Sequence, residues 1–269
     1  MTSRTLALPK TVGAPRWRLP LGLLLPGALL VLAEAGVRSG VIAPNLLPAP
    51  SAVLETLVYL AHNGLAAHIA SSTARVVAGF AAGAGLAVVI GAAVALNRRA
   101  EALLDPSFQA LRAIPSLAWV PLLLLWFGID ETPKLILIAI GAFFPVYMGV
   151  ASGIRGVDRK LIEVAQLYQL DRLALARRVL IPAALPALMT GLRNGLSLAW
   201  MFMVAAELIA ASRGLGFLLS DGRETSRADI VIAAIVLLAV LGKASDSLVQ
   251  VLEKRLLGWR DSYDNQEAR

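Results

Sequence analysis

The sequence contains no cysteine and only two histidines, His62 and His68. Without cysteine the chain can form neither a disulfide framework nor a thiolate metal site. Two histidines supply few ligands for another kind of metal centre, so we expect no metal and no cofactor. We expect both histidines to be surface residues near a membrane interface.

Motifs for catalysis are also missing. The chain contains no Gly-x-x-x-x-Gly-Lys-[Ser/Thr] phosphate loop, no His-Glu-x-x-His pair and no nucleophile elbow. Each of these patterns supplies the geometry for one reaction class. We therefore expect a protein that is not an enzyme and does not hydrolyse ATP itself.

The chain is rich in apolar residues. Hydrophobic residues make up 58% of the 269 positions and charged residues only 16%, and the mean hydropathy is +0.72. These values lie far from ordinary soluble usage and predict an integral membrane protein. The net charge of +7 then reflects the excess of Lys and Arg on cytoplasmic segments, and we expect no nucleic-acid partner.

Six apolar runs predict an all-α integral membrane protein with six transmembrane helices, since each run has about the 20 residues needed to cross a bilayer. The runs are Leu19–Val37, Thr73–Leu96, Leu103–Phe127, Lys134–Gly153, Leu188–Ala211 and Asp229–Leu248. A basic tail before the first run leaves a cleaved signal peptide as an alternative. We expect an amphipathic helix over Ser51–His68 and an external loop over 212–228. The expected organisation is a cytoplasmic tail at 1–18, a transmembrane domain at 19–260 and a second tail at 261–269.

The distribution of basic residues predicts the orientation. Eighteen Lys and Arg residues, Arg112 among them, fall in segments that this topology places inside, and six fall outside. Short cytoplasmic loops carry the excess of Lys and Arg. Both termini are therefore expected in the cytoplasm.

The longest polar interruption, 155–186, is predicted to be a cytoplasmic loop made of two short helices. Asp158 and Asp171 are suitable N-caps, and Leu161, Val164/Ala165 and Tyr168 recur at helical spacing. Pro182 is expected to end the second helix. The apolar stripe either packs on the underside of the protein itself or docks a cytoplasmic partner.

The residues Glu163-Val164-Ala165, followed by Val179-Leu180-Ile181-Pro182, resemble the Glu-Ala-Ala signature of ABC-importer permeases. In that family this loop is the coupling helix that sits in a groove of the ATPase subunit. Gln169 stands where the family has glycine, so a left-handed turn there costs about 1 kcal/mol, or the turn is made differently. The resemblance assigns these residues to the coupling loop: Glu163, Val164, Ala165, Tyr168, Gln169, Asp171 and Pro182.

The resemblance extends over 19–260 and is strong around Leu111-Arg112-Ala113-Ile114-Pro115 and Trp126-Phe127-Gly128. It implies the six-helix architecture of type I importer permeases in a bacterial inner membrane. The chain looks most like the permeases for aliphatic sulfonates, close to those for taurine and nitrate. The implied partners are two copies of an ATP-binding subunit, a second permease copy (a homodimer) and a periplasmic substrate-binding protein.

The fifth predicted span is more polar than the others and provides the candidates for a translocation path. They are Asn194, Ser197, Trp200 and Glu207. Ionisable residues within a span mark a path or a pairing, so an ion pair is the alternative for Glu207. An ion-coupled secondary transporter is the alternative for the whole protein, although it would need carboxylates at midspan.

Overall fold

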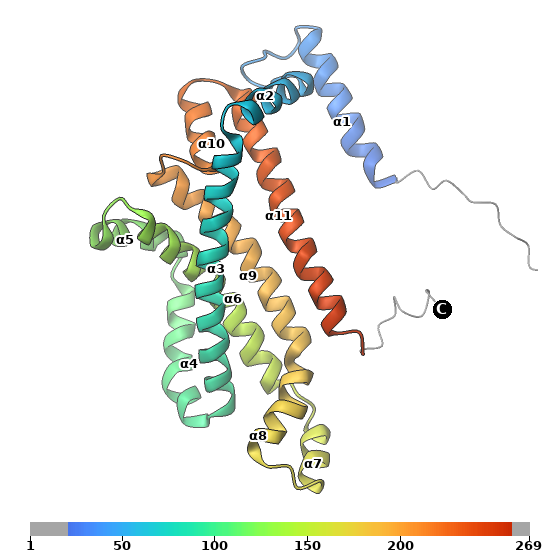
Figure 1. Ribbon diagram of the computed structural model, residues 1–269, viewed down its shortest axis with the longest axis vertical. Coiled ribbons are helices and arrows are strands. Elements are labelled where there is room, and N and C mark those ends of the chain that lie inside the picture. The colour runs from blue at the N-terminus through green and yellow to red at the C-terminus, as the bar shows by residue number, and fades with distance from the viewer. Residues whose placement is uncertain (1–20, 260–269) are drawn as a thin grey trace, which may run out of the picture.

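The computed structural model describes residues 21–259, and both predicted terminal tails, 1–18 and 261–269, lie outside this range. Within it the chain forms helices joined by short connections (Figure 1). The all-α prediction is therefore confirmed for the described part. The elements are α1 (Leu21–Arg38), α2 (Pro50–His62), α3 (Leu65–Leu96), α4 (Arg98–Ala113), η1 (Ser116–Trp119), α5 (Val120–Phe127), α6 (Glu131–Arg155), α7 (Arg159–Leu167), α8 (Arg172–Leu175), η2 (Ala176–Leu180), α9 (Ile181–Ala210), α10 (Leu215–Glu224) and α11 (Ala228–Leu256).

Four helices in the described range are long and apolar enough to cross a membrane, namely α3, α6, α11 and the continuous helix Leu173–Ile209. A fifth candidate is the bent pair of Arg98–Ala113 with Ser116–Phe127. The first predicted span coincides with α1, although its residues 19 and 20 lie outside the described range. The expected total of six spans stays a prediction.

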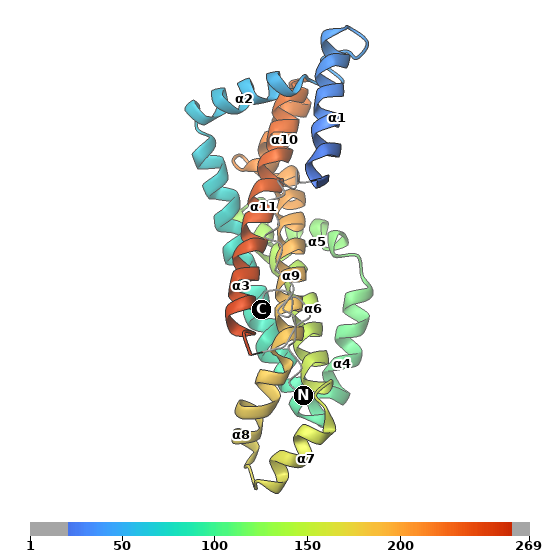
Figure 2. The same cartoon turned by 90° about the vertical axis from the view of Figure 1, so that its right-hand side faces the viewer.

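The third predicted span, Leu103–Phe127, is not one straight helix. The axis turns by 90° between α4 and the following helical segment, and Figure 2 shows α4 and α5 together on one side of α6. The bend lies at Ile114, whose backbone is extended (ψ 125°). Proline disfavours helical geometry in the residue before it, so Pro115 ends α4 at this point.

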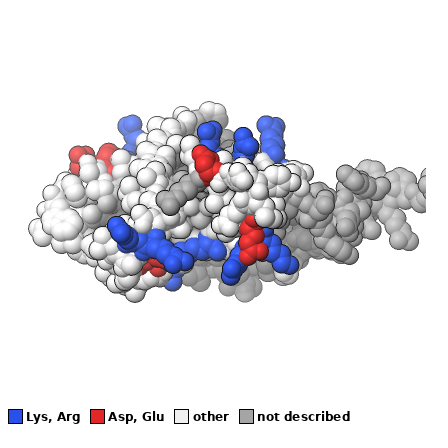
Figure 3. Space-filling model, turned by 90° about the horizontal axis from the view of Figure 1, so that it is seen from below, with Lys and Arg blue, Asp and Glu red and all other residues white. Residues whose placement is uncertain are grey.

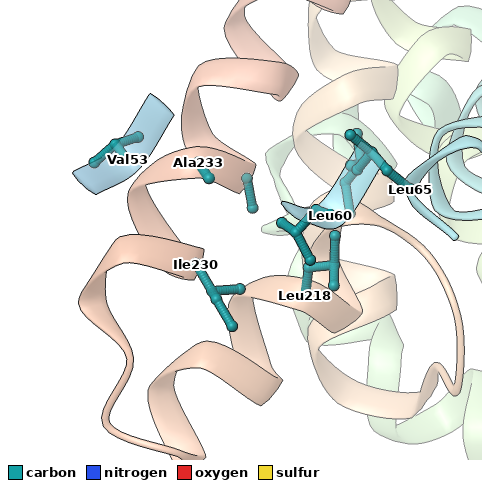
Figure 4. Close-up of a cluster of buried hydrophobic side chains, with 8 residues drawn as sticks. Val53, Leu60, Leu65, Leu218, Ile230 and Ala233 are labelled. Atoms are coloured by element: carbon teal, nitrogen blue, oxygen red, sulfur yellow. The ribbon is translucent and has the colours of Figure 1, made fainter. Parts of the chain in front are cut away.

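Two boundaries differ from the prediction near the α2 end of the bundle. The amphipathic helix ends at His62, and α3 begins at Leu65 after Gly64 turns the chain with φ +92°. The predicted loop 212–228 contains α10, whose buried Leu218 packs with Leu60, Leu65 and Ile230 (Figure 4). Packing in this apolar cluster stabilises α10 as a helix.

Small residues let α6 approach α3 and α9 closely. The sequence patterns Gly79-x-x-x-Gly83 and Gly149-x-x-x-Gly153 predict two such close-packing faces. A methyl group added at Gly83 of α3 would fall on the backbone of Ala139 in α6. One added at Gly149 of α6 would lie 2.8 Å from the carbonyl oxygen of Ala187 in α9. The prediction of close-packing faces is thus confirmed.

Replacing Gly83 with alanine should destabilise the protein by about 1–3 kcal/mol, because the new methyl group overlaps backbone that cannot move aside. Gly85→Ala is the matched control on the same helix, since nothing lies within 4 Å of the added atom. Thermal unfolding in detergent should show a lower transition for Gly83→Ala only. Equal transitions for both variants would contradict this packing.

Candidate functional site

The loop between α6 and α9 contains the two predicted short helices. The Asp158 carboxylate accepts a hydrogen bond of 2.9 Å from the Lys160 amide at the start of α7. The Asp171 carboxylate accepts one of 2.8 Å from the Ala174 amide at the start of α8. Both N-caps are confirmed.

Gln169 makes the turn between the two helices in a left-handed conformation, with φ +53°. Its amide donates to the carbonyl of Gln166 at 2.9 Å, and the Leu170 amide donates to that of Ala165 at 3.1 Å. These bonds satisfy the carbonyls at the end of α7. Gln169 therefore adopts the left-handed conformation expected at the position where the family has glycine. A residue with a side chain adopts it at a cost of about 1 kcal/mol.

The prediction that Pro182 ends the second helix is wrong. The helix runs on from α8 through a π-helical turn, Ala176–Leu180, directly into α9. The Ile181 amide donates to the carbonyl of Ala176, five residues back. This wider turn directly precedes Pro182, which has no amide with which to continue the hydrogen bonds of the helix.

The apolar stripe of the loop is only partly covered by the chain itself. Ala165 is buried at 4% exposure, whereas Leu161, Val164 and Tyr168 are 48%, 49% and 78% exposed. A hollow of about 670 Å³ is lined by Leu161, Tyr168 and Trp259 among others. Basic side chains with a few acidic ones between them are spread over this end of the molecule (Figure 3). Packing on the underside of the protein thus accounts for Ala165 but leaves most of the stripe open.

At the other end of the bundle, Arg75 of α3 joins two carboxylates. It bonds Glu207 of α9 at 2.7 Å and Glu131 of α6 at 2.6 Å. Lys134 adds a bond of 3.0 Å to Glu131. Glu207 is 1% exposed, so a buried charge is compensated by a buried partner.

The remaining lone pairs of Glu207 are also satisfied. Ser72 donates its hydroxyl to both carboxylate oxygens, at 2.8 and 2.9 Å, and the Gly216 amide donates at 2.8 Å. Gly216 and Gly214 leave room for the carboxylate, because a Cβ at either would meet Glu207. The ion-pair alternative for Glu207 is therefore confirmed. His68 also belongs to this region, where its Nδ1 lies 3.0 Å from the carbonyl oxygen of Gly214.

The sequence alone did not reveal the partners of Glu207. Arg75 lies 132 positions earlier, within the second predicted span, Thr73–Leu96. The available signal was an arginine inside an apolar span, since such residues usually face the bundle interior and pair.

The four candidate path residues separate into two groups. Asn194 is exposed and lines a cavity of about 640 Å³ between α4, α6 and α9, and Ser197 is exposed beside it. Trp200 is buried and donates its indole N–H to Ser245 at 2.9 Å, and Glu207 is buried as described. A role in transport stays a prediction for all four, and the geometry favours Asn194 and Ser197.

Comparison with known proteins gives a consistent result. The family described as "Binding-protein-dependent transport system inner membrane component" matches residues 76–258. A putative aliphatic sulfonates transport permease protein of Bacillus subtilis (strain 168) is 42% identical, over 96% of this chain and 94% of the relative. The taurine transport system permease protein of Escherichia coli (strain K12) is 36% identical, over 91% and 93%. A bicarbonate transport system permease protein of Synechococcus elongatus is 31% identical, over 91% and 94%.

The fold also matches a solved structure. A chain of the MetNI methionine ABC transporter in an inward-facing conformation superposes with a TM-score of 0.60. The match covers 72% of this chain and 94% of that one, at 20% sequence identity. At this identity the likeness supports the helical architecture.

Glu207→Gln should destabilise the protein by about 3 kcal/mol or more, because Arg75 would lose its buried counter-charge and keep only the half-exposed Glu131. Glu163→Gln is the control, since it changes a pair whose Arg159 and Glu163 side chains are 91% and 57% exposed. Exposed pairs contribute about 1 kcal/mol at most. Thermal unfolding in detergent measures both variants, and equal shifts would contradict the assigned role of Glu207.

Proposed function

The chain belongs to the family of binding-protein-dependent transport system inner membrane components, and we propose that it carries small sulfonate anions inward as the permease of an ABC importer. Permeases of this family work with ATPase subunits and a substrate-binding protein, and they lack an ATPase site of their own. The chain is thus a multi-pass membrane protein that depends on a partner for energy. Membership in this family argues against an ion-coupled secondary transporter.

The observation that carries the sulfonate proposal is the identity to permeases named for aliphatic sulfonates. These are the 42% identical relative from Bacillus subtilis and one from Escherichia coli at 40% over 91% of the chain. Taurine, the substrate in the name of a further relative, is itself an aminoalkyl sulfonate. The bicarbonate relative is named for a different small anion. The shared chemistry is a compact oxyanion, with taurine, nitrate or another small solute as the alternative substrates.

We further propose that 155–186 couples transport to ATP hydrolysis by docking into an ATPase subunit. Support comes from the open apolar stripe with Tyr168 exposed, from the exposed Leu167 beside it, and from the basic residues around it. The helix runs without interruption from Leu173 to Ile209. A displacement of the loop would therefore be transmitted along this helix to the far end of α9. In the assembly, two ATPase subunits drive two permease copies between outward- and inward-facing states. Both termini of each permease lie in the cytoplasm.

Glu163→Ala should reduce both ATP-driven uptake and stimulation of the ATPase by substrate-loaded binding protein, roughly tenfold for loss of a charged contact. Glu55→Ala is the matched control, because Glu55 is an exposed carboxylate on α2, at the opposite end of the molecule from the coupling loop (Figure 1). Uptake is measured in cells that express the complete transporter. Full uptake by Glu163→Ala would refute its coupling role.

The substrate is tested with radiolabelled ethanesulfonate in proteoliposomes that contain the permease, its ATPase and its binding protein. We expect ATP-dependent accumulation that excess unlabelled taurine or longer alkyl sulfonates reduce more than nitrate or bicarbonate does. Accumulation of another anion but not of ethanesulfonate would exclude sulfonates and retain the permease assignment.

A further inference from the structure

Arg112 differs from the other basic residues alongside the bundle core. Arg75 and Lys134 are paired with Glu131 or Glu207, and Arg193 is paired with Asp246 at 2.9 Å. Within the described residues, Arg112 takes part in no ion pair. It is exposed, at the last turn of α4.

Arg112 lies beside two candidate membrane spans. Arg112 lines the cavity whose α6 residues run from Ile140 to Ser152, the middle and later part of Glu131–Arg155. The α9 residues of the same cavity run from Ala187 to Phe202. Because α6 and α9 are candidate membrane spans, we expect this guanidinium to lie at membrane depth. An arginine at that depth is costly and generally faces a watery cavity or a partner.

The cavity has the size and chemistry of an anion site. Its volume of about 640 Å³ falls in the range of small-molecule pockets, roughly 300–1,000 Å³. Its lining contains no acidic residue, and Arg112 is the one charged side chain in it. Ser116 and Asn194 also line it, while the hydroxyls of Ser152 and Thr190 donate to backbone carbonyls of their own helices.

We infer that Arg112 binds the oxyanion head of the substrate in this cavity during transport, assisted by Asn194. This inference rests on the proposed function, since it assumes that the cargo is a small anion. A guanidinium presents planar paired donors that match the oxygens of a sulfonate or carboxylate. The apolar part of the cavity, which includes Phe144, Met148 and Phe202, receives the alkyl group.

The test uses the complete transporter in proteoliposomes, with ethanesulfonate as the probe and Arg112→Gln, Arg112→Lys and wild type compared. Arg112→Gln should raise the apparent KM for uptake roughly tenfold or more, as for loss of a hydrogen-bonded charge. Arg112→Lys should recover part of this loss. The unfolding temperature should stay unchanged. Arg99→Gln is the control, an exposed arginine on the first turn of α4 and outside the cavity.

An unchanged KM in Arg112→Gln would overturn the inference. A lower unfolding temperature of the assembled transporter, without rescue by lysine, would also overturn it, and would indicate that Arg112 pairs with a carboxylate of the second permease copy. If the wild type transports no ethanesulfonate, the sulfonate proposal fails separately. The same variants are then compared with nitrate and bicarbonate, and an Arg112→Gln transporter equal to wild type for the transported anion again overturns the inference.

Discussion

A charge placed at membrane depth must find a partner or reach water, and the arrangement of this bundle follows from that constraint. Glu207 meets it with Arg75, Ser72 and a backbone amide. Arg193 meets it with Asp246 on α11. Arg112 finds no partner in the described part of the chain and instead lines a cavity. The paired charges hold helices together, and the remaining charge is available to a ligand.

These interactions divide the molecule into regions with different tasks. Two sets of contacts hold α3, α6, α9 and α10 together. The Arg75 network joins them through ion pairs and hydrogen bonds, and Gly83 and Gly149 allow close packing of the backbones. The loop 155–186, with its proposed coupling role, lies at the opposite end of the same long helix that carries Glu207 (Figure 1). The cavity lies between the two ends. A motion imposed on the loop therefore passes the cavity before it reaches the paired charges.

Local chemistry allowed much of this to be predicted from the sequence. The helix caps at Asp158 and Asp171 and the left-handed turn at Gln169 depend on neighbouring residues, and each was predictable. The helix through Pro182 was not, because a π-helical turn depends on how the following helix packs. The partner of Glu207 lies on another helix, more than 100 positions away. Its identity required the tertiary arrangement.

Arg112 is proposed to be the residue that binds the transported anion. The most direct measurement is an experimental structure of the assembled transporter, with its binding protein and ethanesulfonate, trapped with substrate in the membrane. Sulfonate density is expected against the Arg112 guanidinium in the cavity between α4, α6 and α9. Density elsewhere along the bundle, with Arg112 bonded to a carboxylate of the second permease copy, would contradict it.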